Sequence, residues 1–181
     1  EIYDLIVYQV GALSAFVKAE GGKLQHVKPH GALVQHGGED QAMAEAIAKQ
    51  VRYDPQLILF GLAGSWLIKA GDAAALQTAS EVFADRTYQE DGSLTPRTQP
   101  NAMITDDAAS IRQVLTMITE GKVRTATGKD IPVKPNGLYS RRQPEGAGIC
   151  KSIGDALQKE DIPNCVLYAS VTMFEMKGEE A

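Results

Sequence analysis

The chain has 181 residues, of which 44% are hydrophobic, so it is long enough to form one domain with a substantial core. Its net charge is −5, and acidic and basic residues are interspersed along the chain. The sequence has no apolar run near the roughly 20 residues of a membrane span, and it does not begin with the apolar segment of a secretory signal. Nucleic acid and membranes are therefore not expected as partners, and two cysteines without metal-binding spacing, Cys150 and Cys165, indicate a reducing, cytoplasmic compartment.

Apolar periodicity predicts helices and strands that alternate along the chain. A helical apolar stripe begins at once and ends at Gly21-Gly22, and an apolar run at 57–60 is typical of a strand buried on both faces of a parallel sheet. Thr105 or Asp106 is expected to cap a later helix that ends at Gly121. The expected elements are helix 2–19, strand 24–28, helix 41–52, strand 57–60, helix 65–70, strand 78–83, helix 107–120, a hairpin of 123–125 with 131–133, strand 138–139, helix 146–159 and strand 165–171.

This alternation predicts a single α/β domain over residues 1–181, with a mainly parallel sheet and helices outside it. Four helices have predicted inward faces. These faces are Ile2, Leu5, Ile6, Val10, Leu13, Phe16 and Val17 in the first helix, Met43, Ile47 and Val51 in the second, Ala108, Ile111, Leu115 and Ile118 in the capped helix, and Cys150, Ile153 and Leu157 in the last.

Polar side chains follow three of the predicted strands. Lys28 and His30 follow the first, the small-residue run 61–65 follows the second, and Asp85 and Arg86 follow the third. Because parallel strands end at the same edge of a sheet, these groups are expected to converge on one pocket. A binding or catalytic site is therefore predicted at the carboxyl edge of the sheet.

The residue types at this edge suggest definite roles, each with a plain structural alternative. His30 can act as a general acid or base, and Asp85 can orient it or activate water, unless Asp85 is simply an ion-pair partner of Arg86. Lys28 and Arg86 can bind a carboxylate or phosphate. Glu81 alternates with Phe83 along the strand, so it can point inward, or it can be a paired structural carboxylate.

Two further patterns are weaker. Gly61, Gly64 and Ser65 can cradle a phosphate at a helix start, although a tight strand-to-helix turn needs the same small residues and the lysine of a P-loop is missing. His26, His30 and His36 invite a metal site, but Pro29 prevents a straight strand from placing the first two on one face. No metal ligands are assigned.

Five motifs, in order and with family-like spacing, resemble the LamB/YcsF family. They are Tyr8–Leu13, the Lys-Pro-His-Gly-Ala-Leu run 28–33, Leu59–Ser65, Glu81–Tyr88 and Asp91–Pro100. Arg97 and Gln99 match the family pattern in the last motif, which suggests that they line the pocket and bind substrate.

The resemblance implies a distorted β/α barrel that opens 5-oxo-L-proline, a cyclic amide, to L-glutamate in an ATP-dependent reaction with partner subunits. ATP would activate the lactam carbonyl by phosphorylation, and water would attack with Asp85 or His30 as the base. Lys28 and Arg86 would hold the substrate carboxylate or the developing oxyanion. ATP is implied by the resemblance alone, and a homo-oligomer is also open.

Departures from the family pattern keep other functions open. Val34 replaces an aromatic residue, and Arg141-Arg142 stands where the family has a His-Gly-Asp turn, so residues 136–181 are divergent. The family's N-terminal motifs are absent, and the chain resembles the C-terminal two-thirds of a member with its first strands missing. Exposed sheet edges would then predict either completion by another chain or poor stability as a monomer. The alternatives are a binding or regulatory relative without turnover, a metal-dependent hydrolase of the sugar-deacetylase kind, and a scaffold.

Overall fold

The computed structural model describes residues 2–30, 38, 40–136, 138–141, 147–160 and 166–169. The motif residues Gly31–Leu33, together with Val34, His36, Arg142 and Cys165, lie outside the described residues. Among the helices that are described, none is both long and apolar enough to cross a bilayer.

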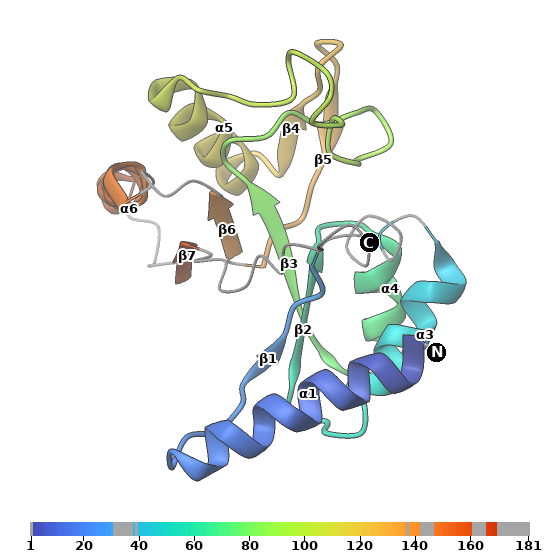
Figure 1. Ribbon diagram of the computed structural model, residues 1–181. Coiled ribbons are helices and arrows are strands. Elements are labelled where there is room, and N and C mark those ends of the chain that lie inside the picture. Colours follow the sequence, from blue (N-terminus) through green and yellow to red (C-terminus); the bar gives the residue numbers. More distant parts are fainter. Residues whose placement is uncertain are drawn as a thin grey trace, which may run out of the picture.

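Five parallel strands form the central sheet (Figure 1). Their spatial order is β1-β2-β3-β6-β7, which is also their order along the chain, because β4 and β5 form a separate hairpin. The mainly parallel sheet expected from the sequence is confirmed. Within the described residues, β1 and β7 form the two edges of this sheet. The strands are β1 (His26–Val27), β2 (Ile58–Leu62), β3 (Gln77–Phe83), β6 (Leu138–Arg141) and β7 (Val166–Ala169).

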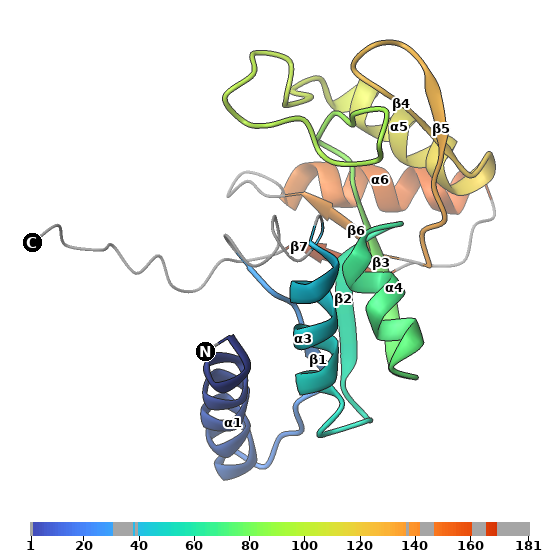
Figure 2. The ribbon, with the colours of Figure 1, turned by 90° about the vertical axis from the view of Figure 1, so that its right-hand side faces the viewer.

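Helices cover the sheet in two groups. Near β1 and β2, α4 packs on β2 and β3, and α3 lies between α4 and α1 (Figure 2). Near β6 and β7, α5 packs against α6 and against a small antiparallel hairpin of β4 and β5. The elements are α1 (Ile2–Ala19), α3 (Gln41–Val51), α4 (Trp66–Ala73), α5 (Asp107–Thr119), α6 (Ala147–Lys159), β4 (Lys122–Arg124) and β5 (Asp130–Pro132).

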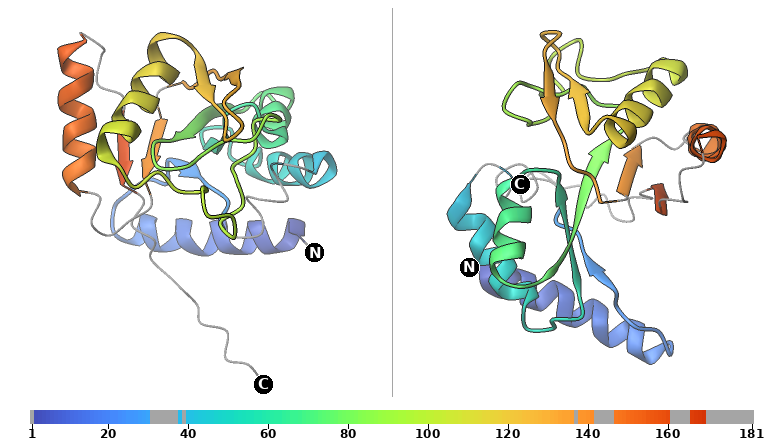
Figure 3. Two further views of the ribbon diagram at one scale, coloured as in Figure 1. Left: turned by 90° about the horizontal axis from the view of Figure 1, so that it is seen from above. Right: turned by 180° about the vertical axis from the view of Figure 1, so that it is seen from behind.

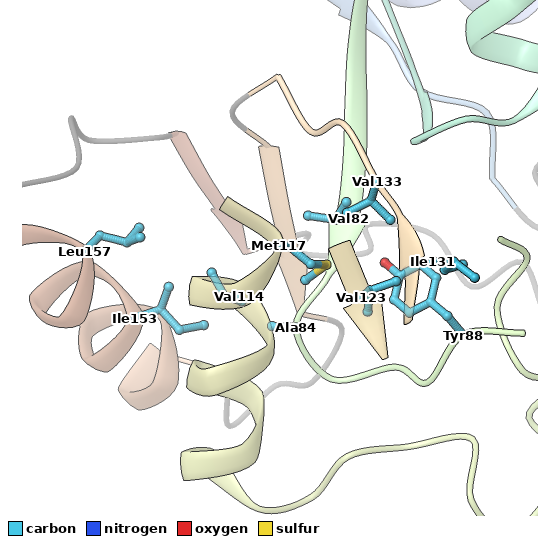
Figure 4. Close-up of a cluster of buried hydrophobic side chains, with 10 residues drawn as sticks. All are labelled: Val82, Ala84, Tyr88, Val114, Met117, Val123, Ile131, Val133, Ile153 and Leu157. Atoms are coloured by element: carbon cyan, nitrogen blue, oxygen red, sulfur yellow. The ribbon is translucent and has the colours of Figure 1, made fainter. Parts of the chain in front are cut away.

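Each group of helices encloses its own hydrophobic core. The first core joins α1, α3, α4 and β2 around fully buried side chains such as Ile47, Leu57 and Leu59. The second joins β3, α5, α6 and the hairpin (Figure 4). The second core consists of Val82, Ala84, Tyr88, Val114, Met117, Val123, Ile131, Val133, Ile153 and Leu157.

The predicted helix ends are confirmed for α1 and α5. Gly21, after α1, and Gly121, after α5, have φ of 74° and 63°, a left-handed backbone that glycine adopts without strain. Asp106 is the cap of α5, because its Oδ2 accepts a hydrogen bond from the Ala109 amide at 2.7 Å.

The predicted inward face of α5 is confirmed only in part, because the most buried residues lie to one side of it. Its buried residues are Ser110, Val114 and Met117. Ala108 is exposed, whereas Ile111, Leu115 and Ile118 are half-buried at the rim of the second core. The reason is that α5 packs against the hairpin and α6 at once, so its apolar stripe is wide and the core lies at the centre of that stripe.

The apolar stripe of α1 is also only partly covered. Ile6 is buried, and Val10 and Val17 are half-buried. Five other large apolar side chains of the predicted stripe and its flank are exposed in the described structure. Their exposed fractions are 45% for Leu5, 38% for Val7, 73% for Tyr8, 54% for Leu13 and 73% for Phe16.

Candidate functional site

The sheet register places the predicted polar residues at one edge. His26 pairs with Ile58, Leu62 pairs with Glu81, and all of these strands run in the same direction. The segment after β1, the turn after β2 and the segment after β3 therefore leave the sheet on the same side. The convergence that the sequence predicted at the carboxyl ends of the strands is present in the backbone.

Lys28 and Glu81 form an ion pair at this edge. Lys28 Nζ donates a hydrogen bond to Glu81 Oε1 at 2.5 Å, and the two side chains are 19% and 4% exposed. The Lys28 ammonium also lies 6.0 Å from the centroid of the Phe83 ring. An ammonium has three N–H donors and Glu81 accepts one of them, so Lys28 is positioned and partly desolvated while it keeps donors for an anionic ligand.

Asp85 and Tyr88 lie near this pair, and each is 1% exposed. The Tyr88 hydroxyl oxygen accepts a hydrogen bond from the Phe83 amide at 2.8 Å. Burial raises the pKa of Tyr88 well above its usual value, and the negative charges of Glu81 and Asp85 raise it further. Tyr88 is therefore a neutral phenol close to two buried carboxylates. The sequence patterns did not predict that Tyr88 lies at this site.

Arg86 is directed toward the loop that follows it. Its Nη2 donates to the Thr95 carbonyl at 2.6 Å and its Nε donates to the Ala102 carbonyl at 3.3 Å, and the residue is 8% exposed. These bonds tie residues 87–102 to the end of β3. The anion-binding role of Arg86 remains a prediction, because these two bonds hold protein carbonyls.

Gln113 of α5 was not anticipated from the sequence. Its Nε2 donates to the carbonyls of Phe83 and Arg86, each at 2.9 Å. The amide thereby fixes the turn that carries Asp85. A lone Gln on a helix has no sequence signature for this contact, because the Phe83 acceptor lies 30 residues earlier in the chain.

The histidines are placed differently from one another. His30 is exposed and follows the buried Pro29, so its imidazole can reach solvent and a ligand. His26 is half-buried in β1, with its ring centroid 4.7 Å from that of Phe60. Burial, and secondarily the charge of Lys28, lowers the pKa of His26, so this imidazole is neutral at pH 7. Among the described residues, no three His, Cys, Asp or Glu side chains converge as metal ligands would.

The turn after β2 has the geometry of a tight strand-to-helix connection. A Cβ on Gly61 would lie 3.2 Å from side-chain atoms of Leu67 and Ile68, and Gly64 has φ of 79°. Ser65 is the N-cap of α4, and its buried Oγ has no hydrogen-bond partner within the described residues. The phosphate role of these three residues stays a prediction.

Arg97 and Gln99 are exposed on the loop between β3 and α5. Their role in binding substrate stays a prediction. Gln99 lines a surface hollow of about 450 Å³ between this loop and the hairpin. The hollow is lined by Gln89, Glu90, Asp91, Thr95, Gln99, Asn101, Ala126 and Thr127.

Five parallel strands with helices packed on them define the chain as an α/β protein, and the Lys28–Glu81 ion pair lies near the carboxyl ends of β1 and β3. A model of the LamB/YcsF family matches residues 1–170, and the chain belongs to this family. The resemblance carried by the five motifs is thereby confirmed.

Curated relatives and one solved structure agree with this assignment. The chain is 53% identical over 164 residues to the A subunit of 5-oxoprolinase from Geobacillus kaustophilus, covering 90% of this chain and 64% of that protein. It is 59% identical over 135 residues to the protein of the same name from Bacillus subtilis, covering 74% and 52%. The crystal structure of a lactam utilization protein from Thermus thermophilus aligns with a TM-score of 0.79 and 38% identity, over 91% of this chain and 66% of that one.

The chain therefore spans between about half and two-thirds of the length of these relatives. The two curated relatives carry the name of one component of an enzyme, and that name implies that they act with partner subunits.

Proposed function

We propose that this protein acts as the A subunit of a cytoplasmic 5-oxoprolinase, which hydrolyses the cyclic amide of 5-oxo-L-proline to L-glutamate with ATP. The names of the relatives support the substrate and the partner subunits. The observation that carries the proposal to this chain is the part-buried Lys28–Glu81 pair at the carboxyl edge of the sheet, where the buried Asp85 follows β3.

In this proposal Lys28 binds the carboxylate of the lactam or the oxyanion that develops during attack. Glu81 holds the ammonium in place, so the interaction costs little reorganisation when the substrate arrives. Asp85 or His30 takes a proton from the attacking water. Asp85 is fixed by its buried turn, whereas His30 is exposed and can approach from the solvent side.

In this proposal the lactam oxygen would take the terminal phosphoryl group of ATP, and ADP would leave. Water would add to the activated carbon, and the ring C–N bond would then break, with the nitrogen taking a proton, to give an acyl phosphate. A second water would hydrolyse that acyl phosphate to L-glutamate and inorganic phosphate. Gly61, Gly64 and Ser65 are candidate phosphate contacts, because the Ser65 hydroxyl is buried without a partner among the described residues at a helix start. The sequence has no P-loop lysine at this turn, so the partner subunits are proposed to supply most of the nucleotide site.

A complete β/α barrel is part of the same proposal. The described strands leave β1 and β7 as edges, and the relatives are longer than this chain. Strands from the unmatched part of such a protein would cover these edges and complete the wall of the pocket.

The second candidate is a binding or regulatory relative that keeps the pocket without turnover. It is favoured by Arg141 at the carboxyl end of β6, where the family pattern has a mixed His and Asp turn. A metal-dependent hydrolase has no comparable support among the described residues.

The test is release of L-glutamate from 5-oxo-L-proline by the full-length protein mixed with its partner subunits, with and without ATP. We expect ATP-dependent release that needs all subunits. Binding of 5-oxo-L-proline without any release of glutamate would overturn the hydrolase assignment in favour of the binding relative. Absence of both binding and release would remove both candidates.

A further inference from the structure

A shallow groove of about 350 Å³ lies between α3 and α4, and it contains none of the residues assigned to the strand-end site. The two helices lie side by side (Figure 3), and α4 buries Leu67, Ile68 and Gly71 on the opposite face, toward β2 and β3. The α3–α4 groove is lined by Gln41, Glu45, Ala48, Lys49, Arg52, Trp66, Lys69, Ala70, Ala73 and Ala74.

Four of the lining residues are alanines, which we call the alanine floor. Ala48 and Ala70 are buried, Ala74 is half-buried and Ala73 is exposed. Alanine side chains let a visiting backbone approach closely, as small residues do at helix contacts. The groove follows the eight residues of α4, about 12 Å at the rise of an α-helix. An open trough of this shape fits a segment of secondary structure better than a compact small molecule.

The rim of the groove is basic in a chain whose net charge is −5. Lys49, Arg52 and Lys69 line it, and none of the described carboxylates forms an ion pair with them. Glu45 is the single acidic lining residue, and it already accepts a hydrogen bond from Gln41 Nε2 at 2.8 Å. The local excess of positive charge selects an acidic ligand.

Trp66 adds an aromatic anchor at the start of α4. It is 37% exposed, and Lys69 Nζ lies 4.4 Å from its ring centroid. Tryptophan and arginine are the residue types that most often dominate the energy of protein interfaces, and here both line one groove.

We propose that the α3–α4 groove is the docking site for an acidic, amphipathic helix of a partner protein in the complex. Small apolar side chains of that helix would lie on the alanine floor and against Trp66, and its carboxylates would face Lys49, Arg52 and Lys69. The inference rests on the proposed function, because it assigns one of the surfaces through which this protein would join its complex.

The experiment measures the dissociation constant between the full-length protein and its purified partner subunits by calorimetry or sedimentation. The test variant is Lys49→Glu/Arg52→Glu, and the matched control is Lys18→Glu/Lys134→Glu, which makes the same change of charge at exposed lysines elsewhere. We expect the test variant to bind at least about tenfold more weakly and the control to bind within about threefold of wild type. Melting temperatures of all variants establish that each is folded.

A third variant separates docking in the groove from general charge attraction. Ala73→Arg adds a positive charge but fills the groove with a long side chain, so it weakens binding if a helix lies there and strengthens binding if only charge matters. Wild-type affinity in both groove variants would overturn the inference while leaving the proposed function intact. Failure of the wild-type protein to bind any partner would instead overturn the proposed function. Binding of free nucleotide that these variants abolish would overturn the helix assignment and give the groove to a small anion.

Discussion

At the scale of single residues, the Lys28–Glu81 pair connects stability with the proposed chemistry. Glu81 is 4% exposed in its side chain, so Lys28→Met leaves a buried carboxylate without its cation. We expect Lys28→Met to lower the free energy of unfolding by about 2–4 kcal/mol, measured by urea denaturation. Lys28→Met/Glu81→Leu should recover most of that loss, because both charges are then removed.

The activity of the same variants should not recover. If Lys28 binds the lactam carboxylate or oxyanion, kcat/KM for 5-oxo-L-proline in the assembled enzyme falls by about 100-fold or more in both variants. Activity restored together with stability in the double variant would show that the pair is only structural.

The lowered pKa of His26 predicts that the stability of the protein depends on pH. Burial and the Lys28 charge lower its pKa below 6.5 in the folded protein, whereas the unfolded chain keeps the ordinary value. Below pH 6.5 the unfolded state therefore binds a proton more readily, so stability falls as the pH drops from 6.5 toward the folded pKa. Above pH 6.5 His26 contributes no slope. Urea midpoints of the wild type and His26→Gln between pH 5 and 8 should diverge only in the acidic part; parallel curves would contradict the assignment.

At the scale of elements, Gln113 couples α5 to the turn that carries Asp85. Gln113→Leu removes the Nε2 donor, so the carbonyls of Phe83 and Arg86 each lose a hydrogen bond. We expect a loss of about 1–3 kcal/mol in unfolding free energy and about a tenfold fall in kcat with little change in KM. Arg112→Ala is the control, since Arg112 is an exposed neighbour whose ion pair with Asp106 is long at 3.8 Å. Equal effects of the two substitutions would contradict a positioning role for Gln113.

The turn between β2 and α4 contains Gly64, whose φ is 79°. No atom lies within 4 Å of a Cβ built on Gly64, so the backbone conformation alone opposes a side chain. Gly64→Ala should cost about 1 kcal/mol in unfolding free energy, and Gly64→Asn should cost less, because Asn tolerates the left-handed region. Equal stability of Gly64→Ala and the wild type in thermal melts would mean that the turn is not held in this conformation.

Across the whole molecule, local patterns in the sequence predicted most elements and their order. Apolar runs located β2 and β3, and the Asp106 cap and Gly121 bounded α5. The strand predicted at 24–28 is shorter, since β1 covers only His26–Val27, and Pro29 accounts for its early end. The α5 face was predicted only in part, because periodicity cannot tell how many neighbours share a wide apolar stripe.

The site could be predicted only in outline. The predicted strand ends indicated where the candidate site lies. They did not indicate that Lys28 pairs with Glu81, because the two residues are 53 positions apart and no local pattern joins them. Tyr88 and Gln113 were missed for the same reason, since a buried hydroxyl and a helix amide acquire their roles from backbone groups that they meet only in the fold. Roles that depend on tertiary contacts leave no periodic signal in one sequence.

The most direct measurement is a crystal structure of the full-length protein with 5-oxo-L-proline. We predict that the lactam lies at the carboxyl edge of the sheet, with its carboxylate or carbonyl oxygen within hydrogen-bond distance of Lys28 Nζ and its ring beside Asp85. A lactam bound in the hollow lined by Gln89 and Gln99, or in the α3–α4 groove, without contact to Lys28, would contradict the proposed binding site.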